Sequence, residues 1–128
     1  MRLLRLAGRS SEGADPRTFT GDARLTRMTG VSDTPAVNAY RVEFHPSART
    51  AWHTHSGPQL LVVLSGRCRV QRTGGPVEVA EAGDVVSIEP DERHWHGADR
   101  EEPMTHLAIN IDATTTWLHK VSDAEYDG

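Results

Sequence analysis

Residues 59–80 read Gln-Leu-Leu-Val-Val-Leu-Ser-Gly-Arg-Cys-Arg-Val-Gln-Arg-Thr-Gly-Gly-Pro-Val-Glu-Val-Ala, and this stretch decides the fold class. It opens with an apolar, β-branched run that ends at a glycine, which predicts a buried strand over residues 59–65. Residues 67–72 alternate between polar and apolar side chains, as in a half-buried strand. A Thr-Gly-Gly-Pro turn over residues 73–76 follows, and Val77–Ala80 predicts a further short strand.

The same succession of short strands and turns continues on both sides of this stretch. A period-two pattern begins near Ala23. Further strands are predicted at Ala36–Phe44, Val85–Ile88, His94–His96 and Met104–Ile111. The only helix signal is a capping-box spacing over Ser122–Glu125, which is equally compatible with a frayed terminus. We therefore expect an all-β sandwich or barrel, with a short C-terminal helical segment left open.

Length and composition restrict the class of protein. A chain of 128 residues with 37% hydrophobic and 25% charged residues fits one small globular domain. Residues 1–18, polar from Arg9 to Pro16, are expected to form a lead-in segment, and residues 19–128 the barrel. A net charge of −4 without a basic cluster argues against nucleic acid as a partner.

Location is also constrained by the pattern of residues. Apolar runs are too short to span a membrane. Arginines interrupt the leucines at the N-terminus, so the continuous apolar block of a signal peptide is not present there. The single cysteine, Cys68, excludes an internal disulfide. A cytoplasmic location is expected.

Histidines are concentrated in two His-x-His pairs. His53 and His55 form the first, and His94 and His96 form the second. In a strand, residues i and i+2 project to the same side, so each pair places two imidazoles in one space. Gln59 follows a short turn and can offer a carbonyl oxygen to the same space. A single histidine is usually structural, but two such pairs in one short chain indicate a metal site.

These residues also carry a family resemblance. His53-x-His55-xxx-Gln59, followed by Gly66, resembles the first motif of the cupin superfamily. Gly83-x5-Glu89-Pro-Asp91, followed by His94, resembles the second motif. The resemblance covers roughly residues 19–126 and implies a small single-domain β-barrel, a jelly roll, that holds one metal ion. Glu89 and Asp91 replace the proline and glycine of the pattern, although Asp tolerates positive φ better than most residues.

A narrower similarity is to small bacterial cupins that include manganese-dependent hydroxynitrile lyases. It implies four metal ligands: His53, His55, Gln59 and His94. It also implies His96, His106 and Asn110 as catalytic or lining residues, where the group has glutamine in place of Asn110. The donor set suits Mn²⁺ or Fe²⁺, with Ni²⁺ or Zn²⁺ as alternatives.

Several functions fit these metal ligands and lining residues. The leading expectation is a metal-dependent lyase, in which the ion acts as a Lewis acid on a small organic substrate and His96 or His106 moves the proton. An iron or manganese dioxygenase and a non-enzymatic small-molecule or metal-binding barrel are the alternatives. Cupin barrels usually pair, so a homo-oligomer, a dimer or tetramer, is expected.

Other candidate residues are expected to lie outside the site. Their parity places Trp52 and Trp95 on the opposite side of their strands from the histidines, where packing is expected. Trp117 is expected to pack the C-terminal segment onto the barrel. His45 and His119 have no partner in sequence and are expected at the surface. Cys68 lies among arginines without a nearby base, so no nucleophilic role is expected.

Overall fold

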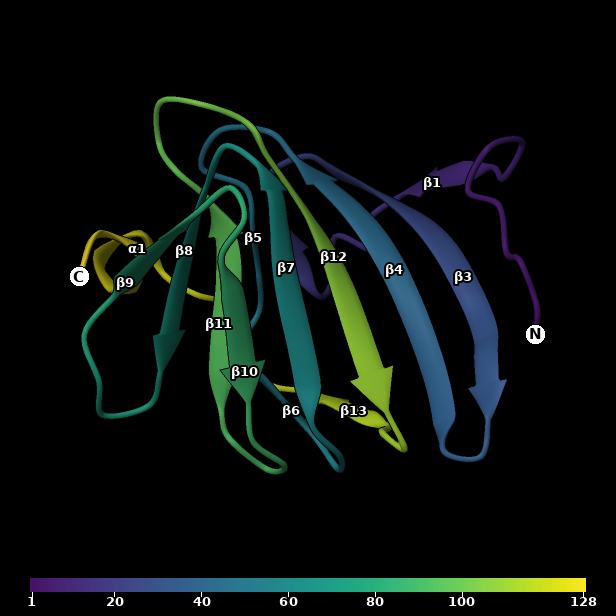
Figure 1. The fold of residues 1–128 in the computed structure, drawn as a ribbon. Coiled ribbons are helices and arrows are strands. Elements are labelled where there is room, and N and C mark those ends of the chain that lie inside the picture. Colours follow the sequence, from purple (N-terminus) through teal and green to yellow (C-terminus); the bar gives the residue numbers. More distant parts are fainter.

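The computed structural model describes all 128 residues, and its regular secondary structure is almost entirely antiparallel strand (Figure 1). The strands are β1 (Ser11–Gly13), β2 (Phe19–Thr20), β3 (Ala23–Asp33), β4 (Ala36–Phe44), β5 (Arg49–Thr50), β6 (His53–His55), β7 (Gln59–Ser65), β8 (Arg67–Arg72), β9 (Glu78–Glu81), β10 (Val85–Ile88), β11 (His94–Ala98), β12 (Met104–Ile111) and β13 (Thr115–Trp117). One short helix, α1 (Asp123–Asp127), ends the chain. The all-β prediction is confirmed.

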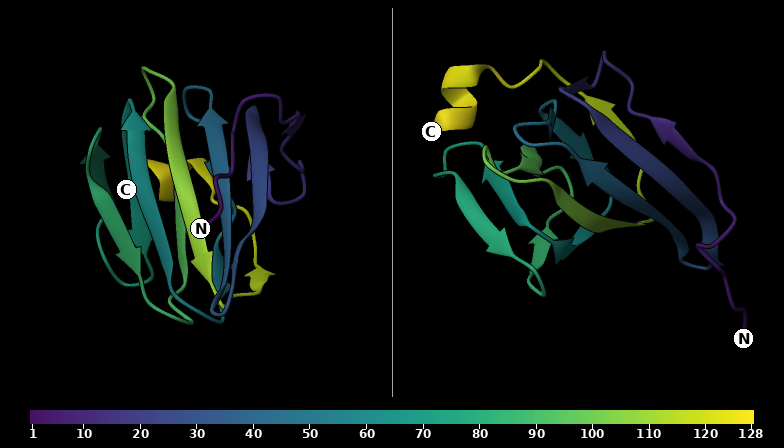
Figure 2. Two further views of the ribbon diagram at one scale, coloured as in Figure 1. Left: turned by 45° about the vertical axis from the view of Figure 1, so that its right-hand side comes forward. Right: turned by 90° about the horizontal axis from the view of Figure 1, so that it is seen from above.

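Two curled sheets face each other and enclose the interior (Figure 2). One sheet has the order β1-β3-β4-β12-β7-β10. The other has the order β13-β6-β11-β5-β2, with β8 pairing β11 and β9 pairing β8. This is the two-sheet jelly-roll arrangement, in which inward side chains of both sheets form the core.

Alternation along the strands decides which side chains point inward. On β12 the even-numbered residues from Met104 to Asn110 are buried, and on β7 the odd-numbered residues from Gln59 to Val63 are buried. The main core cluster contains Phe19, Phe44 and Val63 among ten buried residues. Since β7 and β12 pair directly, their inward rows form one continuous wall of the interior.

The C-terminal segment covers the outside of the histidine-bearing sheet. Ser122 caps α1, and the full capping box with Glu125 is present, so the helix left open by the sequence is formed. Trp52 and Trp95 are buried in a separate cluster with Val121 and Tyr126 from this segment. The prediction that both tryptophans pack away from the histidines is confirmed.

The lead-in segment differs from the loose chain expected there. Its residues Ser11–Gly13 form β1, which pairs with β3 at the edge of the first sheet. No strand was predicted there because Ser-Glu-Gly has no apolar alternation. The domain boundary at residue 18 stays a prediction. No helix is long and apolar enough to span a bilayer.

Candidate metal and proton-transfer site

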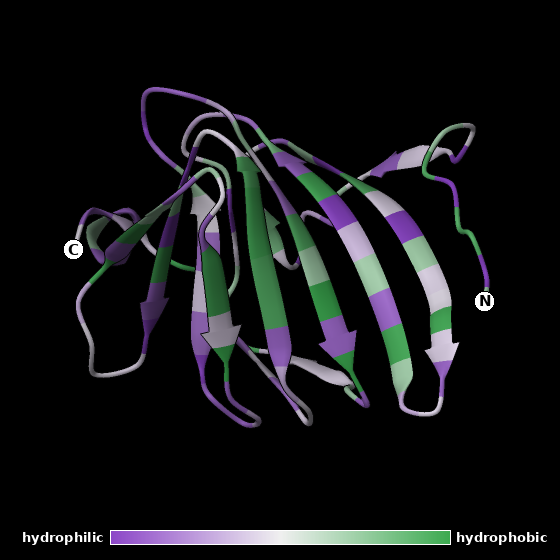
Figure 3. Ribbon diagram, viewed as in Figure 1, coloured by the Kyte–Doolittle hydropathy of each residue, from purple (hydrophilic) through white to green (hydrophobic).

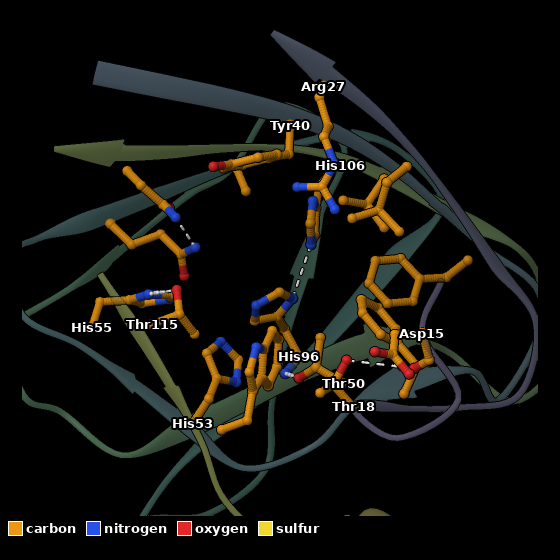
Figure 4. A pocket seen from close by; sticks show the side chains of 18 of the residues that line it. Asp15, Thr18, Arg27, Tyr40, Thr50, His53, His55, His96, His106 and Thr115 are labelled. Atoms are coloured by element: carbon orange, nitrogen blue, oxygen red, sulfur yellow. Dashed lines mark hydrogen bonds between the residues drawn. The ribbon is translucent and has the colours of Figure 1, made fainter. Parts of the chain in front are cut away.

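Four strands bring the predicted site residues together at one cavity, which six of them line; His94 lies beside it, with its ring centroid 4.2 Å from that of His53. His94 on β11 lies directly opposite His53 on β6, and Asn110 on β12 lies opposite Gln59 on β7. The cavity has a volume of about 440 Å³. Figure 4 shows His53, His55, His96 and His106 around it. All seven predicted residues are buried.

His53, His55 and His94 are oriented alike through their Nδ1 atoms. His53 Nδ1 lies 2.9 Å from the carbonyl oxygen of Ala51, and His94 Nδ1 lies 2.8 Å from that of Glu92. A ring nitrogen facing a carbonyl oxygen carries the proton and donates it, so Nε2 of each ring has a free lone pair. Metal-binding histidines are held by this kind of bond.

His55 repeats the arrangement with a side chain as its partner. Its Nδ1 lies 2.9 Å from Thr115 Oγ1. Its Nε2 is buried and has no hydrogen-bond partner. A buried polar atom without a partner is rare and indicates a missing ligand, so this nitrogen fits a metal ion.

Gln59 provides the clearest sign that a cation fits. Its Nε2 donates to Asn110 Oδ1 over 2.7 Å, which turns its Oε1 toward His94 Nε2 at 3.3 Å. Because His94 carries its proton on Nδ1, two lone pairs face each other with no proton between them. A cation bound by both atoms would resolve this repulsion, so the predicted donor set fits a divalent ion.

Burial keeps these imidazoles neutral. It lowers the pKa of His55 and of His94 to about 4, and it holds the pKa of His53 well below its ordinary value. Nearby histidines add to the shift for His53 and His55. Since metals bind the neutral ring, the three ligand candidates are ready at neutral pH.

His96 is also close to the ligand candidates. Nitrogen atoms of His53, His94 and His96 all lie within 4.8 Å of one another. This group of three differs from the predicted ligand set, which has His55 and Gln59 in place of His96. The position of His96 therefore allows either metal binding or a role beside the metal.

A hydrogen bond to His106 distinguishes His96 from the other three histidines. His106 Nε2 and His96 Nδ1 lie 2.9 Å apart, and His96 Nε2 and His106 Nδ1 are buried without partners. The pair shares one proton in its bond, so a proton on His106 Nδ1 leaves His96 Nε2 free to accept one. Burial lowers the pKa of His106 to about 4 and that of His96 well below its ordinary value, so the pair is neutral.

Several residues that line the cavity were not identified from the sequence. Tyr40 and Thr115 line the cavity with the histidines, and Trp117 lies with its ring centroid 4.6 Å from that of His53. Trp117 packs the C-terminal segment onto the barrel, as expected, and because β13 pairs with β6 it lies opposite His53, where it also lines the cavity. The alternation of Thr115 and Trp117 was the available signal for this strand.

The remaining expectations concern residues outside the cavity. His45 and His119 are exposed, as predicted. Burial raises the pKa of the Cys68 thiol to about 12, so the thiolate needed for nucleophilic chemistry does not form at neutral pH. Asp91, which replaces the motif glycine, has a φ of 62°, so the turn keeps the positive-φ conformation.

Comparison with known proteins agrees with the motif analysis. Residues 40–110 match the family described as Cupin domain. The chain is 40% identical to an (R)-mandelonitrile lyase from Granulicella tundricola over 129 residues, which cover 98% of each chain. A cupin-like protein from Thermotoga maritima is 31% identical, with a TM-score of 0.84 over 98% of this chain and 95% of that one.

A more distant structure shares the fold alone. The polyketide cyclase RemF from Streptomyces resistomycificus is 17% identical, with a TM-score of 0.73 over 99% of this chain and 91% of that one.

Proposed function

Because the chain belongs to the cupin family, we propose that it is a metal-dependent lyase that cleaves and forms the carbon–carbon bond of cyanohydrins. One observation carries the proposal: a neutral, hydrogen-bonded pair, His96 and His106, lies beside imidazoles whose free nitrogens fit a metal ion. The substrate class comes from the relative named (R)-mandelonitrile lyase.

The ligands in this proposal are His53, His55, Gln59 and His94, with Mn²⁺ or Fe²⁺ as the expected ion. The donor set supports a Lewis-acidic ion, because three neutral imidazoles and one amide leave the charge of a divalent ion uncompensated by the protein. When bound, such an ion supplies Lewis acidity that polarises a coordinated oxygen.

Proton transfer in this proposal belongs to the histidine pair. With the His106 proton on Nδ1, His96 Nε2 accepts the proton of the cyanohydrin hydroxyl. The C–CN bond then breaks, its electron pair leaves on cyanide, and a carbonyl forms. Cyanide takes the proton back from His96 to leave as HCN, and the pair returns to its starting state.

The first test measures metal and turnover separately. Protein purified without a metal-chelating tag is expected to contain about one equivalent of Mn or Fe by elemental mass spectrometry, and the His53→Ala/His94→Ala variant to lose it. Mandelonitrile cleavage, followed by benzaldehyde absorbance, is expected to fall at least about a hundredfold in His96→Ala, in keeping with the contribution of general-base groups. A His45→Ala variant, altered at an exposed histidine, is the control.

Two results would contradict the proposal. Wild-type protein that takes up none of the four candidate metals on reconstitution would remove the metal site. Metal-loaded protein that consumes oxygen with an organic substrate and leaves mandelonitrile intact would favour the dioxygenase alternative. The small-molecule substrate and cytoplasmic location stay predictions.

A further inference from the structure

Arg27 is the only cationic side chain that lines the cavity. It lies on β3, directly opposite Tyr40 of β4, and its guanidinium is 5.6 Å from the centre of the Tyr40 ring. Figure 4 shows the Arg27 side chain entering the cavity beside Tyr40 and His106. The proposed reaction gives this cation no task.

The guanidinium has free hydrogen-bonding capacity. Its Nε atom pairs with a carboxylate oxygen of Glu12 on β1. That bond leaves the two terminal amino groups without a partner in the protein. Paired N–H groups of an arginine match a carboxylate in bidentate geometry, which a single ammonium group does not.

The two acidic residues near Arg27 do not prevent an anionic ligand from binding to it. Asp15, which also lines the cavity, is already bound through both oxygens by Arg17. Glu12 is exposed and belongs to the three-residue edge strand β1, so a ligand can compete with it for Arg27. The charge available to a ligand is therefore positive at Arg27, although the chain as a whole carries −4.

The size and the walls of the cavity suit a substrate longer than its reacting group. About 440 Å³ falls in the range of pockets that hold drug-sized ligands. Aromatic side chains, among them Phe19, Phe44 and Trp117, line the space. A ring therefore finds apolar contacts while its remote substituent extends toward the rim.

We propose that Arg27 binds an anionic group at the far end of the substrate, so that the substrate class is carbonyl compounds or cyanohydrins that carry a carboxylate. This inference rests on the proposed function for the reacting group, although the anion subsite itself requires only the cavity and Arg27. Glu12 is then a competitor that weakens the subsite.

The test uses a matched pair of ligands on the metal-loaded protein. 4-Formylbenzoate carries the anion, and 4-formylbenzamide is its neutral near-isostere. Calorimetric titration is expected to give 4-formylbenzoate about fivefold tighter binding, the scale of a partly exposed ion pair. Arg27→Gln is expected to erase this preference, and Glu12→Gln to increase it about threefold.

Arg24→Gln is the control variant. Arg24 also lies on β3 and bonds to Ser11 of β1, but it does not line the cavity. Its substitution is expected to leave the preference unchanged. Thermal melts of all variants check that each is folded, and the opposite signs expected for Arg27→Gln and Glu12→Gln separate a binding effect from general destabilisation.

Two outcomes overturn the subsite. Equal affinity of the wild type for both ligands would show that no anion subsite exists. A preference for 4-formylbenzoate that is retained in Arg27→Gln would show that the carboxylate binds elsewhere, such as on the metal. Because binding is measured without turnover, an Arg27-dependent preference in a protein that fails to cleave mandelonitrile would retain the subsite and reject the lyase.

Discussion

Asn110 controls the orientation of Gln59 through a single buried hydrogen bond of 2.7 Å. Removing it would free the Gln59 amide to rotate and would weaken its oxygen as a ligand. We expect Asn110→Ala to reduce the affinity for Mn²⁺ about tenfold, as loss of a residue that orients a ligand commonly does. Competition with a chelator, read by elemental mass spectrometry, measures this change.

Asn38 provides the matched control for this prediction. It lies directly opposite Asn110 on β4, and its side chain accepts a hydrogen bond from the Gly30 backbone instead of holding a candidate ligand. Asn38→Ala is expected to keep the wild-type affinity. Unchanged affinity in Asn110→Ala would show that Gln59 is held by other contacts or is not a ligand.

Individual site residues were predictable where the sequence repeats a spacing. His53 and His55, like His94 and His96, share a strand face because the i, i+2 rule is local. Trp117 was not recognised, since it reaches the cavity only through pairing with β6, a strand distant in sequence. Arg27 was not recognised, because an arginine in a strand is usually a solvent-exposed residue. That the two outer nitrogens of the His96–His106 pair are buried without partners could likewise be seen only in the structure.

Glycines at the ends of elements make different demands on the fold. Gly66, between β7 and β8, has a φ of 74°, and an added Cβ would lie 2.1 Å from the Pro103 carbonyl oxygen. Gly83 has a φ of 95° and open space around it. We expect Gly83→Ala to cost about 1 kcal/mol of unfolding free energy and Gly66→Ala about 3 kcal/mol, since the clash adds to the strain.

Urea unfolding of the two variants at one pH measures this difference. Equal losses would indicate that the β7–β8 turn moves away from Pro103 at little cost. Because both glycines belong to the family motifs, the comparison separates the conformational reason for a motif glycine from the packing reason.

Strands were predictable where they are long or clearly alternating. The expected ranges of β4, β7, β8, β10 and β12 agree with the structure residue for residue. The two- and three-residue strands β1, β2, β5 and β13 were missed, because a pattern needs several residues and their pairing partners are remote. One of these strands, β13, supplies Thr115 to the site. Because so short a strand could not be predicted, this part of the cavity wall was not predicted either.

Acid should destabilise the metal-free protein, because its interior holds neutral histidines. Burial lowers the pKa of His106 to about 4, from an ordinary value of 6.5. Between these values the unfolded chain binds more protons than the folded one, so unfolding free energy falls as the pH decreases through this window. We expect a loss of about 2 kcal/mol from His106 alone between pH 7 and pH 5.

Urea titrations at the two pH values, after removal of metal with a chelator, measure this loss. His106→Gln keeps a group that can bond to His96 and does not titrate, so its unfolding free energy is expected to depend less on pH by a similar amount. An identical pH dependence in wild type and variant would show that His106 is protonated in the folded protein without penalty.

An apolar patch on the outside of the first sheet predicts self-association. Leu60 and Val62 of β7 face outward beside Ile109 and Leu107 of β12, and they continue to Val85 on the edge strand β10. Figure 3 colours β7 and β10 as mostly hydrophobic strands and β12 as a mixed one. Val85 is 58% exposed, and exposed apolar patches of this kind usually mark an interface.

A second copy of the chain is the partner that this surface favours. None of the patch residues is charged, so two copies can approach there despite the net charge of −4 on each. A symmetric pairing would also cover the exposed edge of β10. We therefore expect a mass of at least twice 14.1 kDa in sedimentation velocity.

Charges placed on the patch should dissociate the oligomer. Leu64 continues the outward row of Leu60 and Val62 on β7, and both Leu64 and Val85 are exposed. The Leu64→Lys/Val85→Lys variant is therefore expected to leave the folded monomer stable, and to bring positive charges of the two copies together across the interface. Val79→Lys, at an equally exposed valine of β9, is the control and should leave the mass unchanged. A wild-type mass of 14.1 kDa would mean that the patch remains open to solvent.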